Sequence, residues 1–338
     1  MAITDQLITR VSIPPVATKW QYKDVILMNG SCFSEHISDK LSRYKYNVLS
    51  NPFGILYNPE SLAVSFERIA ALDYYQPDEL VPWNGFIHSP DHHGSFSGRD
   101  QNAVLTRIND HLRAGHEQLK RCTIVGISLG TSKVYRSKDS GAIVANCHKI
   151  PANAFLKEQL SPEDCTGALD RIHHAIHSLS PEARILWTVS PVRHISDGLQ
   201  ENQISKATLL LALSTWLRKH DQSMYFPAYE IMVDELRDYR YYNRDLIHPS
   251  PVAVDIIWER FAEAFIDPEQ WKHHAAIEKI RRAMEHRMLH DDPTGMRTFS
   301  QNQLKQIEQL ETLLPELHWE NERRYFMELM ESDSSMQE

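Results

Sequence analysis

The chain has 338 residues, with 36 Lys and Arg against 45 Asp and Glu, and therefore a formal net charge of −9. Apolar residues make up 42% and charged residues 24%, which excludes a collagen, a coiled-coil rod and a wholly disordered chain. The length suits about two domains, or one large domain with an appendage. No apolar run reaches the roughly 18–20 residues that a membrane-spanning helix needs.

The acidic charge balance, without a basic run, argues against nucleic acid as a partner. Residues 1–15 do not contain the basic segment followed by an apolar segment that is typical of a signal peptide. The four cysteines form no C-x-x-C pair, which argues against a zinc ribbon and a disulfide scaffold. We therefore expect a cytoplasmic protein with no membrane partner, no metal and no cofactor.

Five short apolar runs, each closed by a turn or a polar cluster, predict buried strands. They cover residues 24–28, 46–49, 122–129, 185–189 and 224–227. Most of them are separated by stretches with helical spacing. Strands that alternate with helices favour a parallel sheet covered on both faces. The sequence therefore predicts an α/β fold, a three-layer α/β/α domain over residues 1–268.

Two long insertions interrupt this alternation. Residues 55–120 show little strand signal and contain the polar stretch 88–100, whereas residues 131–165 predict a hairpin of 133–135 and 142–146. Long loops in compact domains are usually functional.

Two amphipathic patterns predict a helical extension over residues 269–330, packed on the core or on a partner, including a second copy of the chain. We expect Pro315 to kink or end the second helix, and residues 291–295 to form the loop between the two. His273 and His274 are expected to be solvated, and residues 331–338 to be disordered. The first pattern consists of Ile277, Ile280, Met284 and Met288, and the second of Leu304, Ile307, Leu310, Leu314 and Leu317.

The first chemical signal lies where the first predicted strand ends, with Gly30 at the turn and Ser31 at the start of a helix. A helix N-terminus offers free backbone N–H groups and a positive dipole end. A serine there can attack a carbonyl while its own N–H helps to hold the oxyanion. The alternative is that Ser31 only caps the helix. The thiol of Cys32 points about 100° away from Ser31 on a helix, so we expect it to serve packing.

The second signal is Asp245 and His248, just ahead of the last helix of the α/β unit. The three-residue offset allows Asp245 to orient the ring of His248 and to fix its tautomer. His248 could then take a proton from a serine hydroxyl. The alternative is a loop histidine beside a local turn.

Together, the two signals resemble the SGNH, or GDSL-like, hydrolases. This resemblance implies a flavodoxin-like sheet with strand order 2-1-3-4-5 and a site at the carboxyl ends of the strands. Residues 30–34 further resemble the motif that names the GSCFA family, with Ser34 in place of its alanine. The resemblance implies Ser31 as nucleophile and Asp245 and His248 as its partners. It extends over residues 20–265 and includes the stretches 51–59, 129–136, 144–149, 188–194 and 225–230.

The resemblance also implies donors for the oxyanion. In SGNH hydrolases these include a glycine after strand two, which Gly54 matches, and an asparagine after strand three. Residues 130–133 contain no asparagine at that place, and losing one donor can cost about 10²–10³ in rate. The candidate donors are therefore the N–H groups of Ser31 and Gly54, the hydroxyl of Ser132 and the amide of Asn146.

The segment 88–98 contains three histidines and an aspartate. A metal site is conceivable, but the spacing matches no standard site, and His92 and His93 would face opposite ways in an extended loop. A loop that faces the substrate through His93, or a plain polar loop, suits the pattern better.

Arg193 and His194 follow the fourth predicted strand, at the edge where ligands bind in such sheets. Arg193 could hold a carboxylate or phosphate with two hydrogen bonds. The alternative is an ion pair with Asp197 or Glu230.

These signals predict a serine hydrolase that cleaves an ester, such as an acyl group on a carbohydrate or on another small metabolite. Ser31 would attack, His248 would shuttle the proton and Asp245 would orient His248. Two alternatives stay open: a catalytically weak binding module on the same fold, and an acyltransferase.

Overall fold

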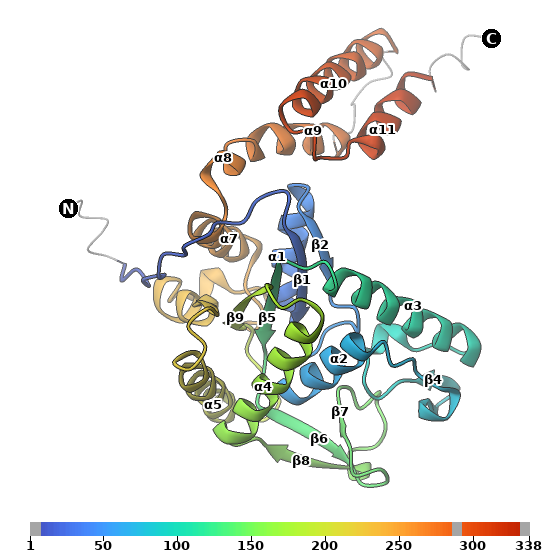
Figure 1. Cartoon of the computed structure of the whole chain (residues 1–338), viewed down its shortest axis with the longest axis vertical. Helices are drawn as coiled ribbons and strands as arrows, with labels where there is room; N and C mark the ends of the chain where they lie inside the picture. The colour runs from blue at the N-terminus through green and yellow to red at the C-terminus, as the bar shows by residue number, and fades with distance from the viewer. Residues whose placement is uncertain (1–7, 286–292, 332–338) are drawn as a thin grey trace.

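The computed structural model of the chain describes residues 8–285 and 293–331 (Figure 1). Its central sheet has the strand order β10-β9-β5-β1-β2, and every neighbouring pair is parallel. Numbered along the chain this order is 2-1-3-4-5, so the expected flavodoxin-like α/β topology is confirmed. The strands are β1 (Val25–Gly30), β2 (Asn47–Ser50), β5 (Ile124–Leu129), β9 (Arg184–Val189) and β10 (Met224–Phe226).

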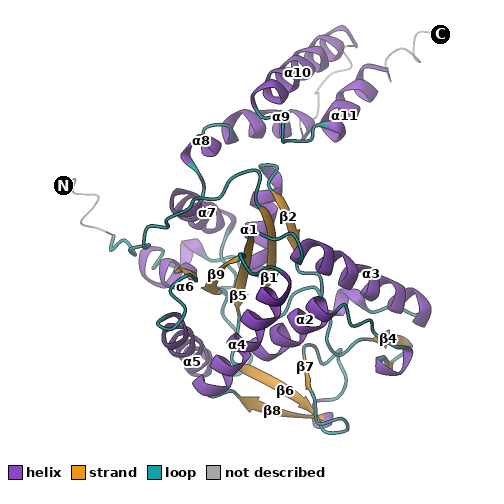
Figure 2. Ribbon diagram, viewed as in Figure 1, coloured by secondary structure: helices purple, strands orange, loops and turns teal. Residues whose placement is uncertain are grey.

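Helices cover both faces of this sheet (Figure 2). Successive residues of one strand belong to different apolar clusters, as Ile26 and Leu27 do, because their side chains point to opposite faces. One cluster includes side chains of α2 (Pro59–Ala71), α3 (Gln101–Leu119), α4 (Pro162–Leu179) and α5 (Leu199–Leu217). The other includes those of α1 (Cys32–Arg43) and α7 (Pro251–Phe265).

The two insertions contain more regular structure than their sequences indicate. The first contains α2, α3 and the hairpin of β3 (Val81–Trp83) and β4 (Phe86–His88). The second contains the expected hairpin of β6 (Lys133–Ser137) and β7 (Ile143–Val144), to which β8 (Phe155–Gln159) adds a third strand. Short helical turns lie at Pro77–Glu79, Gly94–Phe96, Ala152–Ala154, Ala228–Glu230, Ile231–Glu235 and Tyr239–Tyr241.

The helical extension consists of α8 (Pro268–Trp271), α9 (His274–Glu285), α10 (Pro293–Leu313) and α11 (Glu320–Glu331). Its inward apolar residues join the same buried cluster as those of α1 and α7. The helix α10 ends two residues before Pro315, as expected. The predictions for Met288 and for residues 332–338 lie outside the described residues.

The extension is attached at the amino end of β2, away from the edge where the strands end (Figure 1). Tyr46 Oη lies 3.1 Å from His274 Nε2, and Lys45 Nζ lies 2.8 Å from Glu322 Oε1. The expectation of a solvated His274 is therefore wrong, because its ring stacks on Tyr44 and is buried. In the described part of the chain, no helix is long and apolar enough to cross a membrane.

The close approach of β1 and β5 depends on Gly30. Its φ is 137°, and a Cβ placed on it would lie 2.2 Å from the carbonyl oxygen of Ser128. That carbonyl also accepts the backbone N–H of Ser31 at 3.1 Å, so it has little freedom to move. Only glycine suits both the conformation and the space at this position.

We expect Gly30→Ala to lower the free energy of unfolding by about 3 kcal/mol or more, since it combines backbone strain with a clash in the sheet. Gly85→Ala is the matched control, because Gly85 also has a positive φ of 74° but has no atom within 4 Å of its added Cβ. The control should lose only about 1–2 kcal/mol. Urea denaturation followed by circular dichroism measures both, and equal losses would contradict the contact with Ser128.

Candidate functional site

Ser31 lies where β1 passes into α1, at the carboxyl edge of the sheet. Its Oγ accepts the backbone N–H of Phe33 at 3.2 Å, so the residue does cap α1. The same Oγ lies 2.5 Å from Ser128 Oγ, and only 2% of the residue is exposed. The hydroxyl is therefore held by a neighbouring strand in a nearly covered position.

Asp245 and His248 form a pair on the loop before α7. Asp245 Oδ2 lies 2.7 Å from His248 Nδ1, while its Oδ1 accepts the backbone N–H groups of Ile247 and His248 at 2.9 and 3.0 Å. The N–H of Ile247 and then the His248 ring lower the pKa of Asp245 to about 2. An ionised carboxylate only accepts, so Nδ1 donates to it and Nε2 is the basic nitrogen of His248.

The loop that carries this pair is fixed to two neighbours. The backbone N–H of Arg193 donates to Ile247 O at 3.3 Å, and that of Asn243 donates to His248 O at 2.8 Å. The helix α7 begins three residues after His248 and packs with α1, the helix that Ser31 begins, in one buried cluster.

Ser31 and His248 are not hydrogen-bonded to each other in the described part of the chain, where the partners of Ser31 Oγ are Ser128 and Phe33. The structure thus assembles the Asp–His pair on the loop before α7, a helix that packs with the one that Ser31 begins. The catalytic roles of the three residues stay a prediction.

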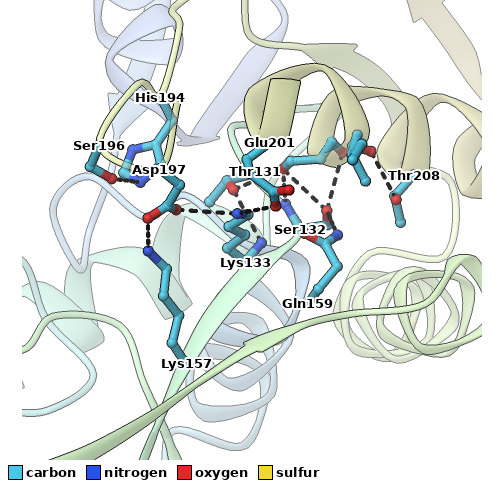
Figure 3. A network of polar contacts seen from close by, with 12 residues as sticks. Thr131, Ser132, Lys133, Lys157, Gln159, His194, Ser196, Asp197, Glu201 and Thr208 are labelled. Atoms are coloured by element: carbon cyan, nitrogen blue, oxygen red, sulfur yellow. Dashed lines mark hydrogen bonds and ion pairs between the residues drawn. The ribbon is translucent and has the colours of Figure 1, made fainter. Parts of the chain in front are cut away.

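Three of the four candidate oxyanion donors are already engaged. The N–H of Ser31 donates to Ser128 O at 3.1 Å, and that of Gly54 donates to Asn51 O at 2.7 Å. The hydroxyl of Ser132 donates to Ser205 O on α5 at 3.1 Å and is fully buried (Figure 3). Each of these bonds would have to break before its donor could hold an oxyanion.

The amide of Asn146 differs from those three donors. Its Oδ1 accepts the backbone N–H of His148 at 2.8 Å, while its Nδ2 has no hydrogen-bond partner among the described residues. A Cβ placed on Gly94 would lie 3.7 Å from this Nδ2. Asn146 therefore lies beside the 88–98 loop with a free donor.

Sequence reasoning missed Asn51 and Ser128 as parts of this site. Asn51 follows β2 with a positive φ of 45°, and its Oδ1 accepts the N–H of Gly30 at 2.8 Å. Its Nδ2 is buried without a partner, which costs about 1–3 kcal/mol for a polar group. Asn51 belongs to a stretch that carries the family resemblance, but nothing in that stretch indicates a bond to the turn before Ser31.

The candidate substrate-binding residues lie in different surroundings. A Cβ on Gly54 would lie 2.4 Å from His93 Cβ, so His93 packs directly against the loop after β2. The guanidinium of Arg193 lies 4.3 Å from the centre of the Tyr242 ring, a cation–π contact. In the described part of the chain, Arg193 forms no ion pair with Asp197 or Glu230.

His194 lies on the loop after β9, which ion pairs hold over β6 and β8 (Figure 3). Its backbone N–H donates to Asn202 Oδ1 at 2.9 Å, and its Nε2 lies 3.0 Å from Ser196 Oγ. On the same loop, Asp197 pairs with Lys133 at 3.2 Å and with Lys157.

Lys206 of α5 is a buried amine at the same edge of the sheet. Its Nζ donates to Gly130 O after β5 and to Ser190 O after β9, each at 2.7 Å. Burial lowers the pKa of Lys206 to about 7. This side chain joins the ends of two strands to α5.

Burial raises the pKa of the Cys32 thiol, so it is not an activated nucleophile, and its Sγ lies 4.0 Å from Tyr57 Oη.

His92 and His93 lie in different surroundings, since the ring of His92 stacks on Phe53 in the core. Within residues 8–285 and 293–331, no group of three His, Cys, Asp or Glu side chains is placed to hold a metal ion.

Comparisons with known proteins agree with the sequence motifs. The GSCFA family matches residues 25–261, and a second family, "GSCFA domain protein, C-terminal domain", matches residues 277–332. No curated protein sequence matches the chain significantly.

Two solved structures are similar to the chain at low identity. A carbohydrate esterase family 3 protein from Talaromyces cellulolyticus has a TM-score of 0.35 and 7% identity, over 70% of this chain and 94% of the other. A mutant acetyl esterase with an acetate ion has a TM-score of 0.35 and 8% identity, over 75% of this chain and 98% of the other.

The buried Lys206 predicts a pH dependence of stability. Its pKa is about 7 in the folded chain but near the ordinary 10.5 when unfolded, so between these values the unfolded chain binds more protons. The free energy of unfolding should therefore rise with pH, by up to about 1.4 kcal/mol per pH unit from this group.

Urea denaturation at several pH values between about 7 and 10 measures this slope. Lys206→Met should remove the contribution, whereas Lys219→Met, at an exposed lysine shortly after α5, should keep it. Parallel curves for wild type and Lys206→Met would contradict the assignment.

Proposed function

Because the chain belongs to the GSCFA family and forms an Asp–His pair on the loop before α7, which packs with α1, we propose that it is a serine hydrolase that cleaves an ester. The observation that carries the proposal is the 2.7 Å bond between Asp245 Oδ2 and His248 Nδ1, on the loop that leads into α7, which packs with α1. That bond leaves Nε2 of His248 as a base, and a hydroxyl lies at the start of α1.

In the proposed reaction, His248 Nε2 takes the proton of Ser31 as Oγ bonds to the ester carbonyl carbon. Asp245 stabilises the imidazolium that results. The tetrahedral intermediate expels the alcohol, which receives the proton from His248 and leaves Ser31 acylated. Water then attacks the acyl-enzyme by the same proton transfers and releases the acid.

The contact between Ser31 and Ser128 has a defined part in this scheme. A hydroxyl can both donate and accept. When Ser31 directs its proton to His248, Ser128 becomes the donor in the 2.5 Å contact and stabilises the charge that develops on Ser31 Oγ. Ser128 is in this way a positioning residue for the nucleophile.

A second candidate function is a binding module on the same fold. The absence of a Ser31–His248 hydrogen bond among the described residues favours it, as do the engaged N–H groups of Ser31 and Gly54. Acyl transfer to a sugar hydroxyl would use the same first half-reaction, with another alcohol in place of water.

Hydrolysis of p-nitrophenyl acetate distinguishes these functions. The wild type should release nitrophenol in turnover, Ser31→Ala should fall to background, and Asp245→Asn should lose about 10²–10⁴ in kcat because the imidazolium loses its carboxylate. A fluorophosphonate probe should label Ser31 in the folded wild type. Equal rates in wild type and Ser31→Ala, without labelling, would favour the binding module.

A further inference from the structure

A cavity of about 390 Å³ lies between the β3–β4 hairpin and the segment after β7. This volume is within the range of small-molecule sites. The residues that the argument uses are Trp83, Phe86, His88, Ser97, Asn146 and His148. None of them belongs to the proposed triad.

One wall of the cavity is aromatic. Trp83 and Phe86 flank the tight turn of the hairpin and are each 39% exposed. Asn84 and Gly85 form this turn with φ of 50° and 74°, the positive values that a two-residue hairpin turn needs. The ring of Trp83 offers an apolar face to a ligand, whereas the Arg99 guanidinium lies 5.6 Å from the centre of the Phe86 ring.

The rest of the cavity lining is mainly polar. The rings of His88 and His148 stack with their centres 4.6 Å apart. Ser97 Oγ lies 2.7 Å from His88 Nδ1, and His148 Nε2 lies 2.7 Å from Ser89 O. Burial lowers the pKa of His148 to about 4, so this imidazole is neutral at neutral pH.

The segment after β7 is strained where it lines the cavity. His148 and Lys149 have consecutive positive φ values of 49° and 59°. Each such residue costs about 1–2 kcal/mol when it is not glycine. Strained backbone of this kind clusters at ligand sites, where the surrounding structure maintains it.

The unpartnered groups of the cavity are mainly donors. Asn146 Nδ2, the Asn84 side chain and Lys149 Nζ have no hydrogen-bond or ion-pair partner in the described part of the chain, and no Asp or Glu lines the cavity. A ligand that fits has apolar faces for the rings and oxygen acceptors along its edge. A sugar ring has both, since its C–H groups form a face and its hydroxyls lie around it.

A neighbour of Ser31 and a neighbour of the cavity lining are both bonded to the same stretch of chain, residues 51–56. On one side, the N–H of Gly30 donates to Asn51 Oδ1 at 2.8 Å, and the N–H of Leu56 donates to Gly30 O at 2.9 Å. On the other side, the N–H of His93, next to the lining residue Gly94, donates to Phe53 O at 2.9 Å.

We propose that this cavity binds a sugar ring, with Trp83 against its face and Asn146 Nδ2 donating to a hydroxyl or ring oxygen. The assignment of that ring to the alcohol part of the ester rests on the proposed function, whereas the binding itself does not.

Direct binding tests the cavity without any reaction. Ser31→Ala protein is titrated with methyl β-glucoside, N-acetylglucosamine and glucuronic acid, followed by saturation-transfer NMR. We expect at least one of them to bind, and Trp83→Ala to weaken that binding at least tenfold. Trp271→Ala is the matched control, because Trp271 is also 39% exposed but lies on α8 at the other end of the molecule.

A second variant tests the hydrogen bond that Asn146 Nδ2 would donate to the sugar, separately from the contact with the Trp83 ring. Asn146→Asp keeps an oxygen for the N–H of His148 but removes the free N–H₂, so it should weaken binding of the neutral sugars while the circular dichroism spectrum stays unchanged. Binding of none of the three sugars, or equal binding by Trp83→Ala, would overturn the proposal.

Kinetics distinguish this proposal from the proposed function. Trp83→Ala should raise the KM for glucose pentaacetate at least tenfold and leave p-nitrophenyl acetate hydrolysis unchanged. Sugar binding that depends on Trp83, in a protein without esterase activity, would support the cavity and reject the hydrolase. Ser31-dependent hydrolysis of both esters with no effect of Trp83→Ala would support the hydrolase and reject the assignment of the cavity to the alcohol part of the ester.

Discussion

The arrangement of the candidate site depends on one close approach between two backbones. Gly30 ends β1 against the carbonyl of Ser128, and the same carbonyl accepts the N–H of Ser31. This contact fixes where β1 stops and where α1 begins, and it places two serine hydroxyls side by side. On the other side of β1, Asn51, which follows β2, stabilises the turn before Ser31, because its Oδ1 accepts the backbone N–H of Gly30. The position of Ser31 is therefore set by sheet pairing on both sides.

The groups around this turn come from loops that are far apart in the chain and meet because parallel strands end at one edge. Each loop is fixed by its own bonds, such as the one from Arg193 to the loop of His248. Lys206 of α5 links the ends of β5 and β9, because its Nζ donates hydrogen bonds to one backbone carbonyl oxygen after each strand. Rigid elements thus carry short loops, which is the usual way to position reactive side chains.

Patterns within a few residues of each other predicted most of what the structure confirms. The apolar runs indicated the five strands, and the Asp245–His248 offset is local, so its hydrogen bond follows from the spacing. The weak strand signal of residues 55–120 agrees with a segment made mainly of the helices α2 and α3, but the helical spacing of Leu62, Phe66 and Ile69 in α2 was missed. His274 could not be placed, because its burial depends on Tyr44 and Tyr46, more than 200 residues away in the chain. The bonds of Asn51, Ser128 and Lys206 likewise depend on tertiary contacts.

The helical extension meets the rest of the chain at the amino end of β2, through Tyr46, Lys45 and Arg43. It is thus remote from the carboxyl edge, where Ser31 lies (Figure 1). Contacts that form on α10 and α11 would therefore leave entry to that edge unobstructed. A tether or fusion partner joined behind α11 would hold the molecule with the edge that carries Ser31 facing away from the point of attachment, which suits immobilisation on a surface.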